Sequence, residues 1–313
     1  MFTLRLGAVA LSVLLIGYCL LSLVVSAGWK LIAKWGQSTS AARSARVLFA
    51  WRMLPLVLSL LVTALYAVPS FLIFEPGHID EKLGPMLIVL SVAACAWLSM
   101  ACMRAFEAHQ NTAQMLSDWR NGSTQIKADC GLPVVVTSSS DPVLTVTGVS
   151  QPSVFISEKA LASLTVREFE AAVRHEAAHV QRYDNLKKLL LRFGAFPCMK
   201  KLEAAWIASS EIAADDAAIS NSAEALDLAS ALIKCSRFAT SRTSGALGSA
   251  LIPVNDHSVA TRITRLCDWS NQGRSQNRDY YGLPLAVTAL LCVTLTYAPL
   301  LRTVHALTEW LVR

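Results

Sequence analysis

The pentapeptide His175-Glu176-Ala177-Ala178-His179 has residue types and a spacing that point directly to chemistry. Residues four positions apart lie on the same face of a helix, so both imidazoles can reach one metal ion. In such HExxH helices the histidines bind zinc, and the glutamate accepts a proton from the water molecule that zinc activates. The sequence therefore predicts one Zn²⁺ ion held by His175 and His179, with Glu176 as the general base.

A catalytic zinc ion takes a third protein ligand and keeps a fourth position for water. The residues after His179 do not follow the metzincin continuation of the motif. The segment Glu211-Ile212-Ala213-Ala214-Asp215 offers two carboxylates on one helical face instead. We expect Glu211 to be the third ligand and Asp215 to orient a ligand histidine, with Asp216 and Glu203 as alternatives for the third ligand.

The elements around these residues predict a mixed domain. Thr165 and Glu168 have the spacing of a capping box, and no glycine or proline follows before Phe193, which predicts one helix over 165–193. The β-rich runs predict a sheet of two to three strands, whose edge at 143–149 could hold an extended substrate by strand addition. The expected strands are 132–136, 143–149 and 153–156, the further helices are 206–219, 223–237 and 258–269, and 241–249 is expected as a loop.

The composition indicates a membrane protein. Only 16% of the residues are charged, against about 25% in soluble domains, and 54% are hydrophobic. These values argue against a disordered chain, a collagen-like fibre and a basic nucleic-acid-binding surface. Four stretches contain no Asp, Glu, Lys or Arg, and each is long enough to cross a lipid bilayer as a helix: 6–29, 53–74, 83–103 and 280–301. A cleaved signal peptide is the alternative for the first stretch.

The distribution of charge predicts the orientation. The segment Lys30–Arg52 carries five cations and no acid, whereas Glu75–Lys82 carries three acids and one lysine. The positive-inside rule then places the first segment in the cytoplasm and the second outside. We therefore expect an N-terminal membrane region over 1–103, which starts outside, and a cytoplasmic domain over 104–279. The first part of that domain, 104–120, is expected to continue the third helix. A fourth span over 280–301 and an outside tail over 302–313 would follow.

The site segments carry a family resemblance. HEAAHVQRYDN followed by SSEIAADDAAI resembles the BlaR/MecR-type antirepressor membrane zinc peptidases, which have a HExxH helix with a nearby Asp-Asn and then a helix with ExxxD. Tyr183 and Asp184 would then fix the motif helix against its neighbours. The resemblance implies an α-helical membrane protein with an α+β, zincin-like metallopeptidase domain, three spans before it and one after it. Members that sense β-lactams carry a large extracellular domain after the fourth span. Only the residues 302–313 follow the predicted fourth span in this sequence, so we expect proteolysis without antibiotic sensing.

A second resemblance is to the HtpX and prenyl-protease group, which often has a His-Pro-Pro…Arg-Ile segment after the metal motifs. His257 with Arg262-Ile263 is similar to that segment but lacks its prolines. The resemblance implies that His257 and Arg262 contact the substrate in the transition state. A surface histidine and a helix-surface salt bridge are the alternatives for these two residues.

The sequence and the resemblance together predict a multi-pass zinc endopeptidase of the bacterial inner membrane. Its partner would be a protein substrate, either a cytoplasmic regulator such as a repressor or a membrane protein cut near the bilayer, and not a nucleic acid. A membrane signalling scaffold that retains a zinc site without proteolysis is the alternative. A transporter is less favoured, because none of the four predicted spans carries a charged residue.

Overall fold

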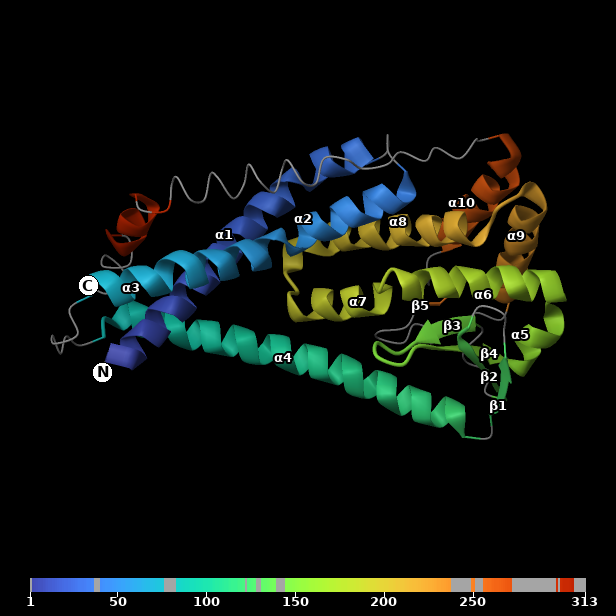
Figure 1. Cartoon of the computed structure of the whole chain (residues 1–313), viewed down its shortest axis with the longest axis horizontal. Coiled ribbons are helices and arrows are strands. Elements are labelled where there is room, and N and C mark those ends of the chain that lie inside the picture. Colours follow the sequence, from blue (N-terminus) through green and yellow to red (C-terminus); the bar gives the residue numbers. More distant parts are fainter. Residues whose placement is uncertain are drawn as a thin grey trace.

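The computed structural model describes residues 2–36, 40–75, 83–121, 123–127, 131–138, 144–237, 249–250, 256–271, 297 and 299–306. Within these residues the protein is mostly helical and has one small mixed sheet. Figure 1 shows long helices at one end of the molecule and the sheet, with the helices that cover it, at the other end.

Three segments of the described chain are long and apolar enough to cross a membrane, namely Phe2–Trp29, Ala41–Phe74 and Pro85–Arg120. They contain the predicted spans 6–29 and 53–74 and all but the first two residues of the predicted span 83–103. The predicted fourth span, 280–301, lies almost entirely outside the described residues. The helices of this region are α1 (Phe2–Gly36), α2 (Ala41–Val62), the π-helical turn η1 (Thr63–Ala67), α3 (Val68–Phe74) and α4 (Pro85–Arg120).

Helix α4 joins the two ends of the molecule (Figure 1). The expectation that the third span continues as a helix through 104–120 is confirmed. Apolar side chains in its first half are exposed, such as Val89 at 67%, and offer a surface that lipid would cover. Near its other end, Trp119 is buried and its ring packs 5.4 Å from that of Phe155 in the sheet.

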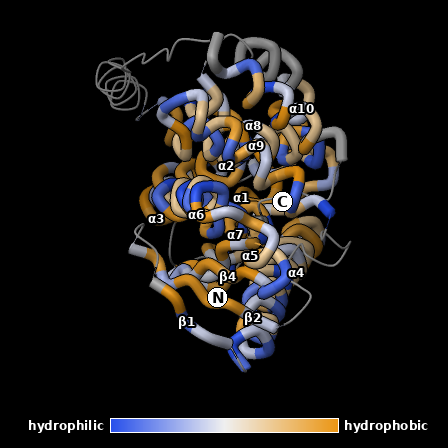
Figure 2. Tube along the Cα trace, turned by 90° about the vertical axis from the view of Figure 1, so that its right-hand side faces the viewer, coloured by the Kyte–Doolittle hydropathy of each residue, from blue (hydrophilic) through white to orange (hydrophobic). Residues whose placement is uncertain are grey.

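The sheet has five strands in the order β1-β2-β4-β3-β5. Strands β2 and β4 are parallel, and the other neighbouring pairs are antiparallel. All residues of β4 are buried, and the tube in Figure 2 is hydrophobic there. The sequence predicts β2 (Pro133–Thr137), β3 (Leu144–Thr147) and β4 (Ser153–Ser157) but misses β1 (Thr124–Lys127) and β5 (Ser249–Ala250). The two missed strands are short and lack a run of β-branched apolar residues.

Strand β5 corrects the expectation that β3 offers an open edge. Thr145 and Val146 of β3 pair with Ala250 and Ser249, so β5 lies outside β3 in the sheet. The predicted loop over 241–249 falls mostly outside the described residues, and its last residue belongs to β5.

The prediction of one helix over 165–193 is wrong. The chain forms α6 (Val166–Gln181) and α7 (Asp184–Phe193), separated by Arg182 and by Tyr183 in the left-handed conformation, with φ 55°. The left-handed region interrupts the helical path, and a non-glycine residue enters it at a free-energy cost. The capping box at Thr165 and Glu168 is confirmed, because both of its hydrogen bonds are present.

The other helices complete a layer over the sheet. One hydrophobic cluster joins β2, β3 and β4 to α6, α9 and α10 through residues such as Val146, Ala171 and Leu228. Helix α6 therefore lies between the sheet and α8 and α9, which fixes the motif in the interior. The remaining elements are α5 (Glu158–Ser163), η2 (Pro197–Met199), α8 (Lys200–Ala218), α9 (Ser222–Ser236), α10 (Asp256–Cys267) and η3 (Asp268–Asn271).

Candidate metal centre

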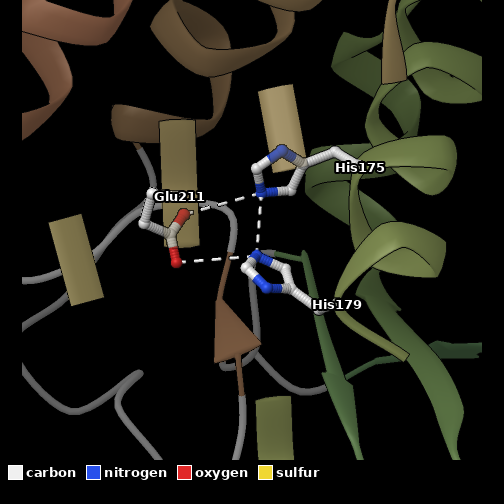
Figure 3. A group of neighbouring side chains, drawn as sticks. All are labelled: His175, His179 and Glu211. Atoms are coloured by element: carbon white, nitrogen blue, oxygen red, sulfur yellow. Dashed lines mark hydrogen bonds and ion pairs between the residues drawn. The ribbon is translucent and has the colours of Figure 1, made fainter. Parts of the chain in front are cut away.

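His175 and His179 stand on adjacent turns of α6, and their rings project from one face (Figure 3). The two Nε2 atoms are 3.2 Å apart. Both residues are almost fully shielded, with 0% and 1% of their surface exposed. The HExxH spacing therefore directs two imidazole nitrogens to one point in the protein interior.

Glu211 of α8 faces these nitrogens from the opposite side (Figure 3). Its Oε2 atom lies 3.5 Å from His175 Nε2, and its Oε1 atom lies 3.5 Å from His179 Nε2. The ligand atoms of the three residues all lie within 4.8 Å of one another, and all three residues are buried. This group could hold a metal ion.

The alternative third ligands face other partners. Glu203, in the first turn of α8, has its Oε1 atom 2.8 Å from Arg52 Nε. Asp216 Oδ1 lies 2.6 Å from Arg265 Nη2. Because successive helical residues are rotated by about 100°, Asp216 points away from the face that carries Glu211 and Asp215.

Each histidine has a second carboxylate behind it. His175 Nδ1 lies 2.9 Å from Asp215 Oδ1, and His179 Nδ1 lies 2.7 Å from Asp184 Oδ2. Both aspartates are 1% exposed. Such carboxylates fix the tautomer and orientation of metal-binding histidines. The contact of Asp184 follows from the break at Tyr183, which sequence patterns miss. The signal for this residue in the sequence is the Asp-Asn pair after the HExxH helix, which is part of the family resemblance.

These contacts make the centre fit a cation. With the proton of each ring on the Nδ1 atom that faces an aspartate, each Nε2 presents a lone pair to the centre. Two such nitrogens and the Glu211 carboxylate form a convergent set of acceptors. Burial lowers the pKa of His175, but Asp215 and Glu211 outweigh burial and raise it, so a proton competes with a metal ion for this place.

Arg262 of α10 lies behind the carboxylates, where its guanidinium is 2% exposed. It donates from Nε and Nη2 to Asp215 over 2.8 and 2.6 Å, and from Nη1 to Glu211 Oε2 over 3.1 Å. Burial raises the pKa values of both carboxyls, but Arg262 and the histidines outweigh burial and lower them. Neither sequence interpretation of Arg262, as a substrate contact or a helix-surface salt bridge, describes this buried network. The side chain of His257, in the first turn of α10, lies outside the described part of the structure.

Glu176 is 0% exposed and lies between the histidines and β3. Its Oε2 atom accepts a hydrogen bond from the Val146 backbone N–H over 3.0 Å. Its Oε1 atom is buried and has no hydrogen-bond partner among the described residues. Burial raises the pKa of Glu176 to about 8. One carboxylate oxygen is thus anchored to the sheet, while the other is available to a ligand.

The first turns of α7 bring two further groups to the centre. Asn185 Nδ2 donates to the backbone carbonyls of Val146 and Gly148 over 3.3 and 3.1 Å, which ties α7 to the strand that anchors Glu176. Burial lowers the pKa of Lys188, although nearby Glu211, Asp184 and Glu176 act in the opposite direction. The family resemblance includes Asn185 in its Asp-Asn pair without giving it a role, and no sequence pattern singled out Lys188.

No protein-family model matches this chain, and no curated protein matches it.

Proposed function

We propose that this protein is an integral-membrane zinc endopeptidase with His175, His179 and Glu211 as the zinc ligands and Glu176 as the general base. Two imidazoles and one carboxylate are a ligand set that zinc uses in catalytic sites, with a fourth position left for water. A zincin-like domain fold is part of this proposal, since the HExxH helix lies beside a strand of a small mixed sheet.

The observation that carries the proposal is the state of Glu176. A purely structural metal site has no need of a buried carboxylate beside the first histidine. Here that carboxylate has one oxygen fixed by Val146 N–H and the other without a partner among the described residues. An unpartnered buried carboxylate oxygen costs about 1–3 kcal/mol, so its retention favours a functional role.

The residues of the chain divide the chemistry among them. Zinc, when bound, would polarise the scissile carbonyl and lower the pKa of a water molecule toward 7. Glu176 Oε1 accepts a proton and later donates it to the leaving amine. Against the larger effect of burial, which raises the pKa of Glu176, His179 and the hydrogen bond from Val146 N–H lower it, and a bound cation would act in the same direction as they do. Asp184 and Asp215 hold the two rings in the orientation that this geometry requires.

The membrane setting defines the class of substrate. We propose a bacterial inner-membrane location, with the N-terminus outside and the domain after α4 in the cytoplasm, because the only strongly basic segment between spans is 30–52. The substrate would be a cytoplasmic regulator such as a repressor, or a membrane protein cut close to the bilayer.

The test uses full-length protein in lipid nanodiscs, with its zinc content and its hydrolysis of fluorescently labelled, denatured casein measured together. We expect Glu176→Gln to retain zinc and to lower kcat by about 100-fold or more. The paired variants His175→Ala and His179→Ala should lose both zinc and activity. Glu170→Gln changes an exposed glutamate on the same helix and serves as the matched control, with wild-type values expected.

Two outcomes would overturn the proposal. If Glu176→Gln hydrolyses casein at the wild-type rate, Glu176 is not the general base. The second outcome is a wild-type protein that binds zinc through the three ligands but hydrolyses neither casein nor the membrane proteins of its own host. That result would indicate a scaffold that retains a zinc site.

A further inference from the structure

Helices α7 and α8 form a hairpin, and each arm carries a residue of the metal centre. Helix α7 runs from Asp184, which contacts His179, to Phe193, and α8 returns from Lys200 past Glu211 to Ala218. Figure 1 shows the two helices one above the other, joined at the side of the long helices. At 1.5 Å per residue, the turn lies about 15 Å along α7 from Asp184, and Glu203 lies about 12 Å along α8 from Glu211. The turn of this hairpin is therefore remote from the metal centre but rigidly connected to it.

Arg52 of α2 binds both arms at that turn. Its Nε atom donates to Glu203 Oε1 over 2.8 Å, and its Nη2 atom donates to the backbone carbonyl of Gly194 over 2.5 Å. The Tyr18 hydroxyl of α1 donates to the same carbonyl over 2.6 Å. Gly194 ends α7 and Glu203 lies in the first turn of α8, so one guanidinium joins the two arms to the second predicted span.

The burial of Arg52 is the unusual feature. The residue directly precedes the uncharged stretch 53–74, where a cation in contact with water or headgroups would be enough to set orientation. Here the side chain is 1% exposed. A buried ion pair is often no more stabilising than a well-packed apolar pair, but its hydrogen bonds fix direction and distance. A need for fixed geometry at the hairpin turn explains this arrangement better than stability does.

We propose that Arg52 is a positioning residue of the metal centre. By holding the turn of the hairpin, it sets the position from which α8 presents Glu211 to the histidines and α7 presents Asp184 to His179. The proposal rests on the metal-binding part of the proposed function. It does not require the metal-bound protein to be a protease.

The chain offers a matched control for the test. Arg5 and Glu75 form a second pair with a buried arginine: Arg5 Nη2 lies 2.8 Å from Glu75 Oε1, and the side chains are 3% and 13% exposed, against 1% and 27% for Arg52 and Glu203. This pair joins the first turn of α1 to the residue after α3 and is remote in sequence from the hairpin. Each double variant removes the buried arginine together with its paired carboxylate, so neither member of the pair is left without the other, and thermal unfolding compares their costs in stability directly.

The experiment compares Arg52→Met/Glu203→Gln with Arg5→Met/Glu75→Gln in full-length protein in lipid nanodiscs. Zinc affinity is measured by competition with a chelator, thermal unfolding gives stability, and kcat and KM are measured on labelled casein. We expect the Arg52 pair variant to bind zinc about 10-fold more weakly or worse, with a lower kcat and an unchanged KM. The Arg5 pair variant should keep wild-type zinc affinity at a similar loss of thermal stability.

Arg52→Lys is the second variant, because it keeps the charge and cannot reach Glu203 and Gly194 with the same fork of donors. We expect zinc affinity between those of the wild type and the double variant, and this variant decides the question if the double variant does not fold. Zinc affinity at the wild-type level in the Arg52 variants, or a loss no larger than in the Arg5 pair variant, would overturn the proposal. Failure of the protease proposal is separate, since it shows in Glu176→Gln and wild-type hydrolysis and not in zinc affinity.

Discussion

The metal centre is built on two parallel relays. His175 has Asp215 behind its Nδ1 atom, and His179 has Asp184 behind its Nδ1 atom, at 2.9 and 2.7 Å. The aspartates are themselves held by cations, Asp215 by Arg262 and Asp184 by Arg182 and Lys187. Each aspartate therefore keeps its charge in the interior and keeps one ring in the tautomer that binds a metal ion through Nε2.

We predict that Asp184→Asn and Asp215→Asn each weaken zinc binding by about 10- to 100-fold, because the amide no longer fixes the charge or tautomer of its histidine. Competition with a chelator of known affinity measures the change. Asp118→Asn, at an exposed position of α4, is the control and should bind zinc as the wild type does. A zinc affinity of Asp184→Asn equal to that of the control would show that this aspartate only anchors α7.

At the scale of the elements, helix α6 is fixed at both of its ends. At its start, Glu168 completes the capping box and also accepts hydrogen bonds from Ser230 Oγ and Lys234 Nζ of α9. At its end, the left-handed Tyr183 turns the chain so that α7 begins beside the histidines. The start anchors α6 to the domain core, and the end brings Asp184 to the metal centre.

The anchor at Glu168 predicts a pH dependence of stability. Burial raises the pKa of this carboxyl, but hydrogen bonds from Lys234, Ser230 and Thr165 outweigh burial and lower it to about 2, from an ordinary value of 4.5. A carboxyl with a lowered pKa stabilises the fold fully above pH 4.5 and loses that contribution as the pH falls toward 2.

We therefore expect Glu168→Gln to lower the free energy of unfolding by about 1–3 kcal/mol at neutral pH. The difference between wild type and variant should shrink as the pH falls from 4.5 toward 2. Thermal unfolding of both proteins across this range measures the difference, with Glu170→Gln as the exposed control on the same helix. A difference that stays constant with pH would show that the Glu168 charge does not stabilise the fold.

At the scale of the whole molecule, the charges between the predicted spans would set the orientation in the membrane. Packing connects the long N-terminal helices to the part of the protein that carries the sheet. Five cations between 30 and 52 predict a cytoplasmic segment, but the structure buries one of them, Arg52, in an ion pair with the partly exposed Glu203. The helical spans are thereby joined to the helix that carries Glu211. Orientation would then depend on the other four cations of the segment.

We predict that replacing these four cations by Gln inverts the orientation of a measurable fraction of the protein. An epitope tag inserted after Asn121, in the turn that follows α4, reports the side of the membrane through antibody access in sealed vesicles of known orientation. The four substituted residues are Lys30, Lys34, Arg43 and Arg46. The control replaces four exposed cations of the domain, Lys159, Arg167, Lys200 and Lys201, and should keep the wild-type orientation. Identical tag access in both variants would contradict the charge-based topology.

Local patterns in the sequence determined much of this protein. Uncharged length was sufficient to locate the three N-terminal helices that can cross a membrane, since this property depends on consecutive residues alone. The spacing of four between His175 and His179 placed both rings on one face of α6, because helical geometry is the same in any context. The same rule selected Glu211 and Asp215 as a pair.

Tertiary structure alone decided the contacts between residues far apart in the chain. Val146 N–H reaches Glu176 across 30 residues, Arg262 reaches Asp215 across 47, and Arg52 reaches Glu203 across 151. The break at Tyr183 belongs to this group, because no local signal interrupts the helix. The residues that directly follow the left-handed Tyr183 are Asp184 and Asn185, which contact His179 and β3. The sequence by itself thus predicted the three apolar helices and the three side chains that could hold a metal ion, since both follow from helix geometry and residue type. Only packing decided what holds those side chains in place, because the partners come from different elements.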